Sequence, residues 1–339
     1  MGSTTDLNIE EPDALISYLR GREVIENTEQ PTVRVLGGGV SGRVVLVKRA
    51  NGQAWVLKQA LPKLRVAVDW FSSPERVHRE ASALRWLGAL GVPVPALRFE
   101  DHTYHLLAMD AVPDPHENWK AMLLSGHLDM RHVEAFAQIL AGIHVNSHAR
   151  RTEIEGAFGD CSFFESLRIE PYFIYAAEQV PAAFGFLSDV IASTRRNRRC
   201  LVHGDFSPKN VLVREQQLIL LDHEVAHFGD PAFDLGFSMT HLLSKAHHLI
   251  EHRHRFQEGA LRYWTVYWRH VGTEDWSEAL EYRSVRSILA CLLARVAGRS
   301  PLEYLDQSER ETQKRVVLAL MADTPDTVPD LISGFVGSL

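Results

Sequence analysis

Hydrophobic and polar positions divide the chain into a strand-rich first third and a helix-rich remainder. Short runs of β-forming residues predict strands over 32–36, 44–47, 55–57 and 104–109. Asn51-Gly52, between the second and third of these runs, is a strong signal for a β-hairpin. Apolar residues at helical spacing predict helices over 14–19, 74–87, 133–143, 163–175, 237–250, 261–268 and 285–296. The pattern therefore predicts an α+β protein in which a small sheet precedes a mostly helical part.

Two short apolar runs, 211–213 and 218–221, interrupt the helical part and are flanked by polar residues that a simple hairpin does not need. His203-Gly204-Asp205 precedes the first run, Asn210 comes five positions after the aspartate, and Asp222 follows the second run. A polar β-turn around Asn210 is the simple structural interpretation. The complete spacing, flanked by strands, instead resembles the catalytic loop of protein kinases with its metal-binding aspartate on the next strand.

This resemblance carries a specific chemistry, because phosphoryl transfer requires positioning and charge neutralisation from the protein. Asp205 is the candidate base that would accept the proton of an attacking hydroxyl. Asn210 and Asp222 offer the oxygen ligands that Mg²⁺ prefers. Glu224, two positions after Asp222, is a candidate additional ligand or an outer support of the metal.

The tripeptide His203-Gly204-Asp205 and the run Gly229-Asp-Pro-Ala-Phe-Asp-Leu-Gly236 resemble the aminoglycoside phosphotransferase and choline kinase group. The resemblance implies a protein-kinase-like bilobal fold, with an N-lobe antiparallel sheet at 1–110 and a larger, mostly helical C-lobe at 111–339. It also implies ATP and Mg²⁺ as cofactors and a small alcohol as substrate. Within this pattern, Asp234 and His203 are expected to support the catalytic loop.

The N-terminal third contains the expected nucleotide-binding residues. A glycine-rich turn follows the first predicted strand, and its candidate phosphate-binding residues are Gly37, Gly38, Gly39, Ser41 and Gly42. Lys58 ends the third strand and is the candidate catalytic lysine that clamps the phosphates, with Glu80 of the next helix as its ion-pair partner. Backbone groups of Asp110 and Val112, just after the last strand, are expected to meet the adenine.

Local resemblance to 5-methylthioribose kinase suggests where the acceptor would bind. Lys58-Gln-Ala-Leu-Pro62 leads into Trp70, which resembles the tryptophan-bearing loop of that family, or else packs on the following helix. Glu170 lies in a stretch that resembles the family's Thr-Glu/Asp-Pro-Tyr run. Arg295 resembles the second arginine of its substrate-binding pair, while Ala294 replaces the first. Asn210 is a further departure, because the family often lacks an asparagine there.

Several alternatives stay open at this stage. Arg295 would either contact the substrate or form a salt bridge with a nearby acid such as Glu303. The expected acceptor is a sugar-like alcohol, with an aminoglycoside or amino alcohol as the alternative. A nucleotide-binding pseudokinase scaffold is less favoured, because a scaffold does not need Lys58, Asp205 and the two metal-ligand candidates together. Zinc binding at 247–254, a histidine-rich stretch, is disfavoured because it has no clear third ligand.

The composition indicates the cellular compartment and the kinds of partner, and it does not change the predicted kinase-like class. The 339 residues carry a formal net charge of −7, which argues against non-specific nucleic-acid binding. Three widely separated cysteines lack metal-ligand spacing and indicate buried thiols in a reducing compartment. No apolar run reaches membrane-spanning length, and the first residues do not resemble a secretory signal. We therefore expect a cytoplasmic protein with no membrane or nucleic-acid partner; the pattern does not address its oligomeric state.

Overall fold

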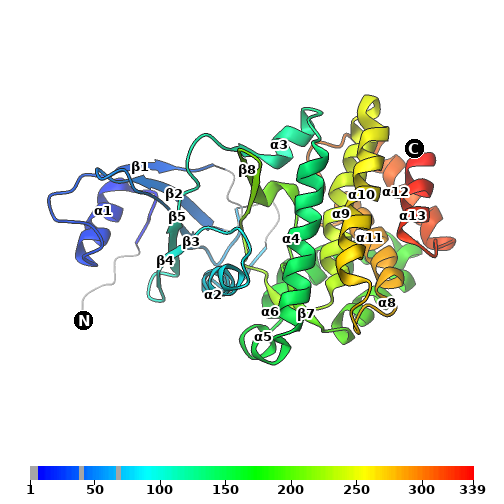
Figure 1. Cartoon of the computed structure of the whole chain (residues 1–339), viewed down its shortest axis with the longest axis horizontal. Helices are drawn as coiled ribbons and strands as arrows, with labels where there is room; N and C mark the ends of the chain where they lie inside the picture. The colour runs from blue at the N-terminus through cyan, green and yellow to red at the C-terminus, as the bar shows by residue number, and fades with distance from the viewer. Residues whose placement is uncertain (1–6, 38–41, 66–69) are drawn as a thin grey trace.

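The structure is a computed structural model that describes residues 7–37, 42–65 and 70–339. Its N-terminal part contains one five-stranded antiparallel sheet with the strand order β1-β2-β3-β5-β4. The strands are β1 (Thr32–Val35), β2 (Gly42–Lys48), β3 (Ala54–Ala60), β4 (Leu97–Asp101) and β5 (Leu106–Asp110). Figure 1 shows this sheet at the left of the molecule, with the helical part at the right. The predicted α+β, bilobal kinase-like class is confirmed.

Two helices cover the sheet, one on each face. Side chains alternate along β5, so that Leu106 and Ala108 pack with α1 (Pro12–Gly21) while Leu107 and Met109 pack with α2 (Arg76–Ala89). The β2–β3 hairpin turns at Gly52, whose φ of +86° favours glycine. This alternation decides which strand side chains face α2, and that face includes the candidate lysine.

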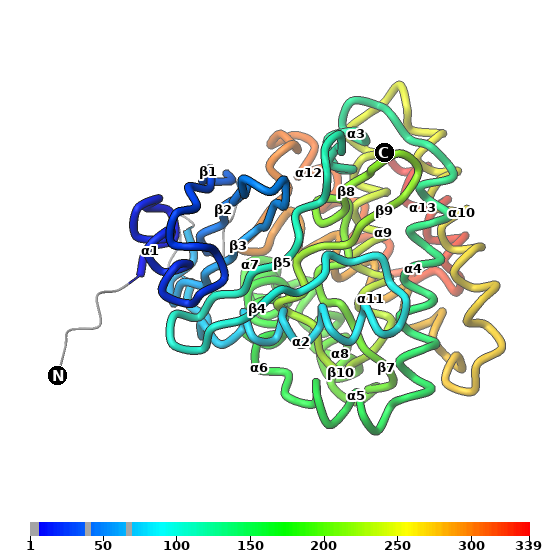
Figure 2. Tube along the Cα trace, turned by 60° about the vertical axis from the view of Figure 1, so that its left-hand side comes forward, coloured from blue at the N-terminus to red at the C-terminus, as the bar shows by residue number. Residues whose placement is uncertain are grey.

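The helical part packs around one large apolar core. Helices α4, α9, α10 and α11 form its centre, with α9 in contact with both α10 and α11, and α4 in contact with α10. Figures 1 and 2 show these helices on the side of the molecule away from the N-terminal sheet. The helices are α3 (Trp119–Leu124), α4 (Met130–His148), α5 (Arg151–Phe158), α6 (Ser162–Phe164), α7 (Tyr175–Gln179), α8 (Phe184–Arg196), α9 (Pro231–His248), α10 (Arg253–Val271), α11 (Leu280–Ala297), α12 (Gln307–Ala322) and α13 (Val328–Gly337).

The polar motif lies between short strands within this helical part. A three-stranded sheet has the order β6-β8-β9, and a separate antiparallel pair joins β7 to β10. Their bounds are β6 (Glu117–Asn118), β7 (Cys200–Val202), β8 (Val211–Arg214), β9 (Gln217–Leu220) and β10 (His227–Gly229). The two predicted apolar strands are therefore present as β8 and β9, which pair in antiparallel fashion. The loop between β7 and β8 contains Asp205 and a 3₁₀ turn at Pro208–Asn210.

The predicted helix over 163–175 differs in kind from the expectation, because Glu165–Ile174 is a π-helix. Pro171 lies inside it and has no N–H to donate. Such π-helical turns are frequent at functional sites. Because β5 ends at Asp110, we propose to divide the chain between 110 and 111. None of the helices in the described ranges is long and apolar enough to cross a bilayer.

Candidate active site

A cavity of about 1320 Å³ is lined by residues from both the N-terminal sheet and the helical part. Its walls contain Lys58 and Glu80 together with Asp205, Asn210 and Asp222. Segments separated by more than a hundred positions in the sequence therefore meet at one site. The same cavity contains most of the residues that sequence reasoning selected.

Lys58 lies where the sheet meets α2. Alternation along β3 turns its side chain to the face that α2 covers, and its Nζ is 2.6 Å from Oε1 of Glu80. The same Nζ is 2.9 Å from Oδ1 of Asp222. Burial by itself would lower the pKa of Lys58, but Asp222 and Glu80 raise it well above its ordinary range. The lysine is therefore a permanent cation at physiological pH.

Asp205 is buried and has an asymmetric set of partners. Its Oδ2 accepts from Nδ2 of Asn210 at 2.8 Å and lies 3.1 Å from Nη2 of Arg168 and 3.0 Å from Nζ of Lys209. Its Oδ1 is buried and has no hydrogen-bond partner within the described part of the chain. Burial would raise the pKa of Asp205, but Arg168 and Lys209 hold it below its ordinary value. An ionised carboxylate with one uncommitted oxygen is suited to accept a proton.

The cavity is also lined by Asn210, Asp222 and Glu224. Their side chains differ in how many of their polar atoms already have partners. Asn210 uses its amide nitrogen to bind Asp205, while Glu224 Oε2 is 3.0 Å from Nε of the fully buried Arg76. Asp222 adopts a φ of +66°, a left-handed conformation that aspartate tolerates better than most residues. Burial would raise the pKa of Asp222, but Lys58 and Lys209 lower it strongly. An amide oxygen and an ionised carboxylate at one edge form a donor set that fits Mg²⁺.

Asp234 and His203 hold the loop around Asp205 by the kind of hydrogen bonds expected of loop supports. The carboxylate of Asp234 accepts from the backbone N–H groups of His203 at 2.7 Å and Gly204 at 2.8 Å. Nδ1 of His203 accepts from the N–H of Asp205 at 3.2 Å. Gly204 has a φ of +76°, and a Cβ there would come within 2.9 Å of the carbonyl oxygen of Val225. A residue with a side chain is therefore excluded at this position in the observed loop geometry.

The expected nucleotide-binding segments line the same cavity as far as the structure describes them. Gly37 and Gly42 belong to the lining, whereas Gly38, Gly39 and Ser41 lie outside the described residues. Asp110 and Val112 also line it. The N–H of Asp110 donates to the carbonyl of Ala96 at 2.9 Å, so this group is not available to a ligand.

The candidate acceptor residues separate into two groups. Trp70 lines the cavity, and its Nε1 donates to the carbonyl of Ser166 at 3.1 Å. Glu170 and Arg295 are not among the described residues that line the cavity. Glu170 is half-exposed and pairs with Arg299 at 2.7 Å.

Arg295 lies one layer behind the cavity. It is buried, and its Nη1 donates to the hydroxyl of Tyr172 and to Oγ of Ser300, each at 3.1 Å. Tyr172 and Ser300 do line the cavity. A salt bridge between Arg295 and Glu303 was the alternative expectation, but Glu303 pairs with Lys120 instead. Arg295 therefore reaches the site only through the residues it supports.

Sequence reasoning missed two buried arginines. Arg168 donates from Nε to the carbonyl of Gly204 at 2.7 Å and pairs with Asp205, and Arg76 pairs with Glu224. Both lay inside segments that the sequence had marked, but nothing in a helical pattern says which arginine turns inward.

The sequence agrees with this geometry: residues 32–282 match the model of the phosphotransferase enzyme family, and the chain belongs to that family. Methylthioribose kinase 1 from Oryza sativa subsp. japonica is 22% identical over 68% of this chain and 61% of its own length. The chain thus spans less than two thirds of the length of the curated relatives it matches.

Solved structures support the fold. Amicoumacin kinase hAmiN, in complex with AMP-PNP, Ca²⁺ and Ami, has a TM-score of 0.56 at 13% identity, over 88% of this chain and 90% of its own. A choline/ethanolamine kinase family protein from Mesorhizobium loti has a TM-score of 0.51 at 13% identity, over 96% of this chain and 98% of its own. At these identities the similarity concerns the fold alone.

Proposed function

We propose that the protein is an ATP- and Mg²⁺-dependent kinase that phosphorylates a hydroxyl of a small, sugar-like metabolite. The observation that carries this proposal is the convergence of Lys58, Asp205, Asn210 and Asp222 on the walls of one cavity. A lysine clamp, a carboxylate base and a pair of oxygen ligands are the parts that phosphoryl transfer requires. Membership in the phosphotransferase family supports the same reaction class.

Asp205 is proposed to accept the proton of the acceptor hydroxyl at Oδ1. The other oxygen, Oδ2, is occupied by Asn210, Arg168 and Lys209, which fix the orientation of the carboxylate. Oδ1 is therefore the atom left for an acceptor hydroxyl. Lys58, held by Glu80, is proposed to bind the phosphates of the nucleotide. The backbone at Gly37 and Gly42, which line the cavity, offers a close approach to those phosphates.

Asn210 and Asp222 are proposed to hold Mg²⁺, which when bound neutralises charge on the phosphate oxygens. Glu224 is better suited to an outer role, because Arg76 already balances its carboxylate. Lys58 contacts Asp222 directly and so fixes one of its oxygens. The protein's own contribution is to orient these oxygens before the nucleotide arrives.

The acceptor is proposed to be neutral or anionic. Arg168, Lys209 and Lys120 line the cavity together with Tyr172 and Ser300. Such a wall offers hydrogen bonds to hydroxyl and carboxylate oxygens but repels a polycation. The relatives named methylthioribose kinase support a sugar-like acceptor, and Trp70 offers an apolar face for it. A polycationic aminoglycoside is correspondingly disfavoured.

A panel of pentoses, thiosugars, sugar acids, amino alcohols and aminoglycosides tests the proposal. ATP consumption is measured with each compound, and the phosphorylated product is identified by mass spectrometry, with Asp205→Asn as the inactive comparison. Transfer to a neutral or acidic sugar is expected. Transfer confined to polycations would overturn the acceptor class, and nucleotide binding without transfer to any compound would favour the pseudokinase alternative.

A further inference from the structure

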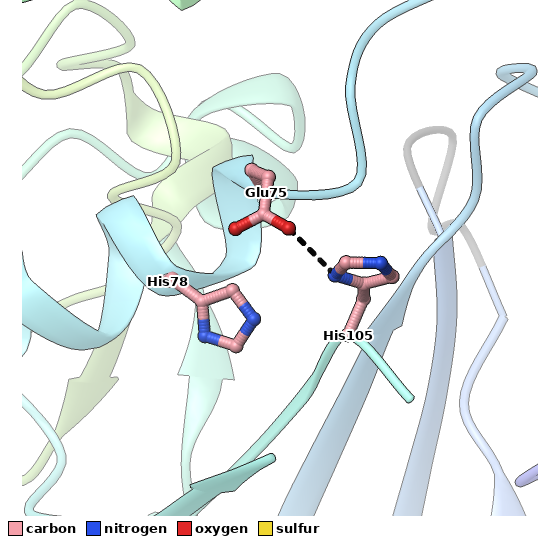
Figure 3. A group of neighbouring side chains, drawn as sticks. All are labelled: Glu75, His78 and His105. Atoms are coloured by element: carbon pink, nitrogen blue, oxygen red, sulfur yellow. Dashed lines mark ion pairs between the residues drawn. The ribbon is translucent and has the colours of Figure 1, made fainter. Parts of the chain in front are cut away.

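A second cluster of potential ligands lies outside the cavity, at the amino end of α2. Glu75 immediately precedes the helix, His78 lies in its first turn, and His105 lies in the turn between β4 and β5. One ligand atom from each of these side chains lies within 4.8 Å of the others. Figure 3 shows the three side chains gathered between the helix and the strands. Two separate elements thus supply two imidazoles and a carboxylate to one place.

His78 is oriented as a metal-binding histidine would be. Its Nδ1 is 2.9 Å from Oε2 of Glu100, and because a carboxylate can only accept, the ring proton is on Nδ1. The neutral ring then carries its lone pair on Nε2. That atom is buried and has no hydrogen-bond partner among the described residues, and Figure 3 shows it on the side of His105. A carboxylate behind a histidine is the usual outer support of a metal ligand.

His105 and Glu75 complete the cluster. Nδ1 of His105 is 3.4 Å from Oε1 of Glu75, longer than a normal N–H···O hydrogen bond. This separation is close to the roughly 3.3 Å between neighbouring ligand atoms of a tetrahedral zinc with bonds of about 2.0–2.1 Å. His105 has a φ of +46°, and its carbonyl accepts from the N–H of Ala60 at 3.0 Å. The exposed side chain of Glu75 is able to rotate toward the two rings.

A second group, His78, Glu100 and His102, shares one member but is less suitable. The rings of His78 and His102 are stacked, with centroids 3.7 Å apart and planes 13° apart. Imidazole lone pairs lie in the ring plane, so stacked rings direct them along parallel planes and not toward one point. Glu100 is in addition already paired with Arg85. These contacts make Glu100 a support for His78 and leave His102 outside the ligand set.

We propose that Glu75, His78 and His105 form a Zn²⁺ site, with Glu100 orienting His78. Two nitrogens and one carboxylate oxygen suit zinc, with the fourth position left for water. The set differs from the all-oxygen donors of Asn210 and Asp222, which suit Mg²⁺. A bound ion would join the start of α2 to the β4–β5 turn.

Titration of the full chain with Zn²⁺, without nucleotide or Mg²⁺, tests the site independently of the proposed kinase activity. The wild type is expected to bind one equivalent. His78→Gln and His105→Asn should each weaken this binding by more than roughly 10²-fold, and Glu100→Gln by roughly 10- to 100-fold. Asparagine is chosen at position 105 because it tolerates a positive φ. His102→Gln is the matched control and should bind as the wild type does.

Thermal unfolding provides the second readout, because an ion that binds only the native state raises Tm. Zn²⁺ should raise the Tm of the wild type and of His102→Gln, but not that of His105→Asn. If the wild type binds no more zinc than His105→Asn does, the site does not exist. If His102→Gln alone removes binding, the other histidine group is the true site and the proposal is wrong.

Discussion

The two ends of the cavity are built in different ways. The proposed nucleotide end brings together Lys58, Glu80 and Asp222, which lie at motif positions on a strand, on the helix over it and after a second strand. The proposed acceptor end is formed by side chains from the loop before α2, from α3, from the π-helix and from the loop after α11. Its residues are Trp70, Lys120, Arg168, Tyr172 and Ser300.

The two ends also differ in their balance of positive and negative side chains. At the nucleotide end one lysine faces two carboxylates, whereas at the acceptor end Arg168 and Lys209 converge on the single carboxylate of Asp205. We propose that the two cations beside Asp205 favour a neutral or anionic acceptor. From this comparison we infer that reaction chemistry and substrate choice depend on opposite ends of one site. Variants at the two ends should therefore differ in which kinetic constant they change.

The largest effect is expected at Asp205, the proposed base. Asp205→Asn should lower kcat by roughly 10²- to 10⁴-fold, the usual contribution of a general base, because the amide cannot take the acceptor proton. Nucleotide affinity, measured by titration calorimetry, should stay close to that of the wild type. Asp189→Asn, on an exposed surface, is the matched control. Near wild-type turnover in Asp205→Asn would remove this residue from the mechanism.

At the nucleotide end, Asp222→Ala should weaken Mg²⁺-dependent nucleotide binding by more than roughly 10²-fold. The reason is that even the outer partners of metal ligands contribute 10- to 100-fold. Titration calorimetry with ATP, with and without Mg²⁺, measures the change, and circular dichroism checks the fold. Unchanged Mg-ATP affinity in a folded variant would show that Asp222 is not a metal ligand.

At the acceptor end, Arg168→Lys should lower kcat/KM for the acceptor at least about tenfold, or roughly 1.4 kcal/mol. Lysine cannot reproduce the planar fork that bonds the carbonyl of Gly204 and the carboxylate of Asp205 together. The KM for ATP should hardly change. Steady-state kinetics with each substrate varied in turn tests this separation of the two ends.

Arg295→Lys is the paired variant one layer further out. It should reduce kcat/KM less than Arg168→Lys does, and it should lower Tm, because Arg295 binds Tyr172 and Ser300. An acceptor-specific loss in Arg295→Lys as large as that of Arg168→Lys would mean that this arginine reaches the substrate directly.

The last expected effect is on stability and not on kinetics, and it concerns a residue behind the acceptor end. Lys245 is fully buried, and burial, with Lys120 and Arg295 nearby, lowers its pKa from 10.5 to about 7. Between these two pH values the unfolded chain binds more protons, so this group makes stability rise with pH. Lys245→Met should therefore raise Tm most below pH 7, and the gain should shrink toward pH 10. Calorimetric scans across this range test it, and a gain independent of pH would contradict the explanation.

By itself the sequence determined the class of fold and most of the nucleotide end. Alternation along the strands, the hairpin signal at Gly52 and the spacing from His203 to Asp222 are local patterns, and local geometry suffices to read them. The alternation also explains why Lys58 meets Glu80, since the side chain of Lys58 lies on the face of the sheet that α2 covers.

Only the tertiary structure decided which residues form the proposed acceptor end and the proposed zinc site. Helical spacing does not fix which long side chain turns inward, so Arg168 lines the site while Glu170, two positions later, pairs with Arg299. The gathering of His78 and His105 likewise depends on how α2 packs against the β4–β5 turn. Such sites arise from contacts between segments far apart in the chain, and a one-dimensional pattern does not contain those distances.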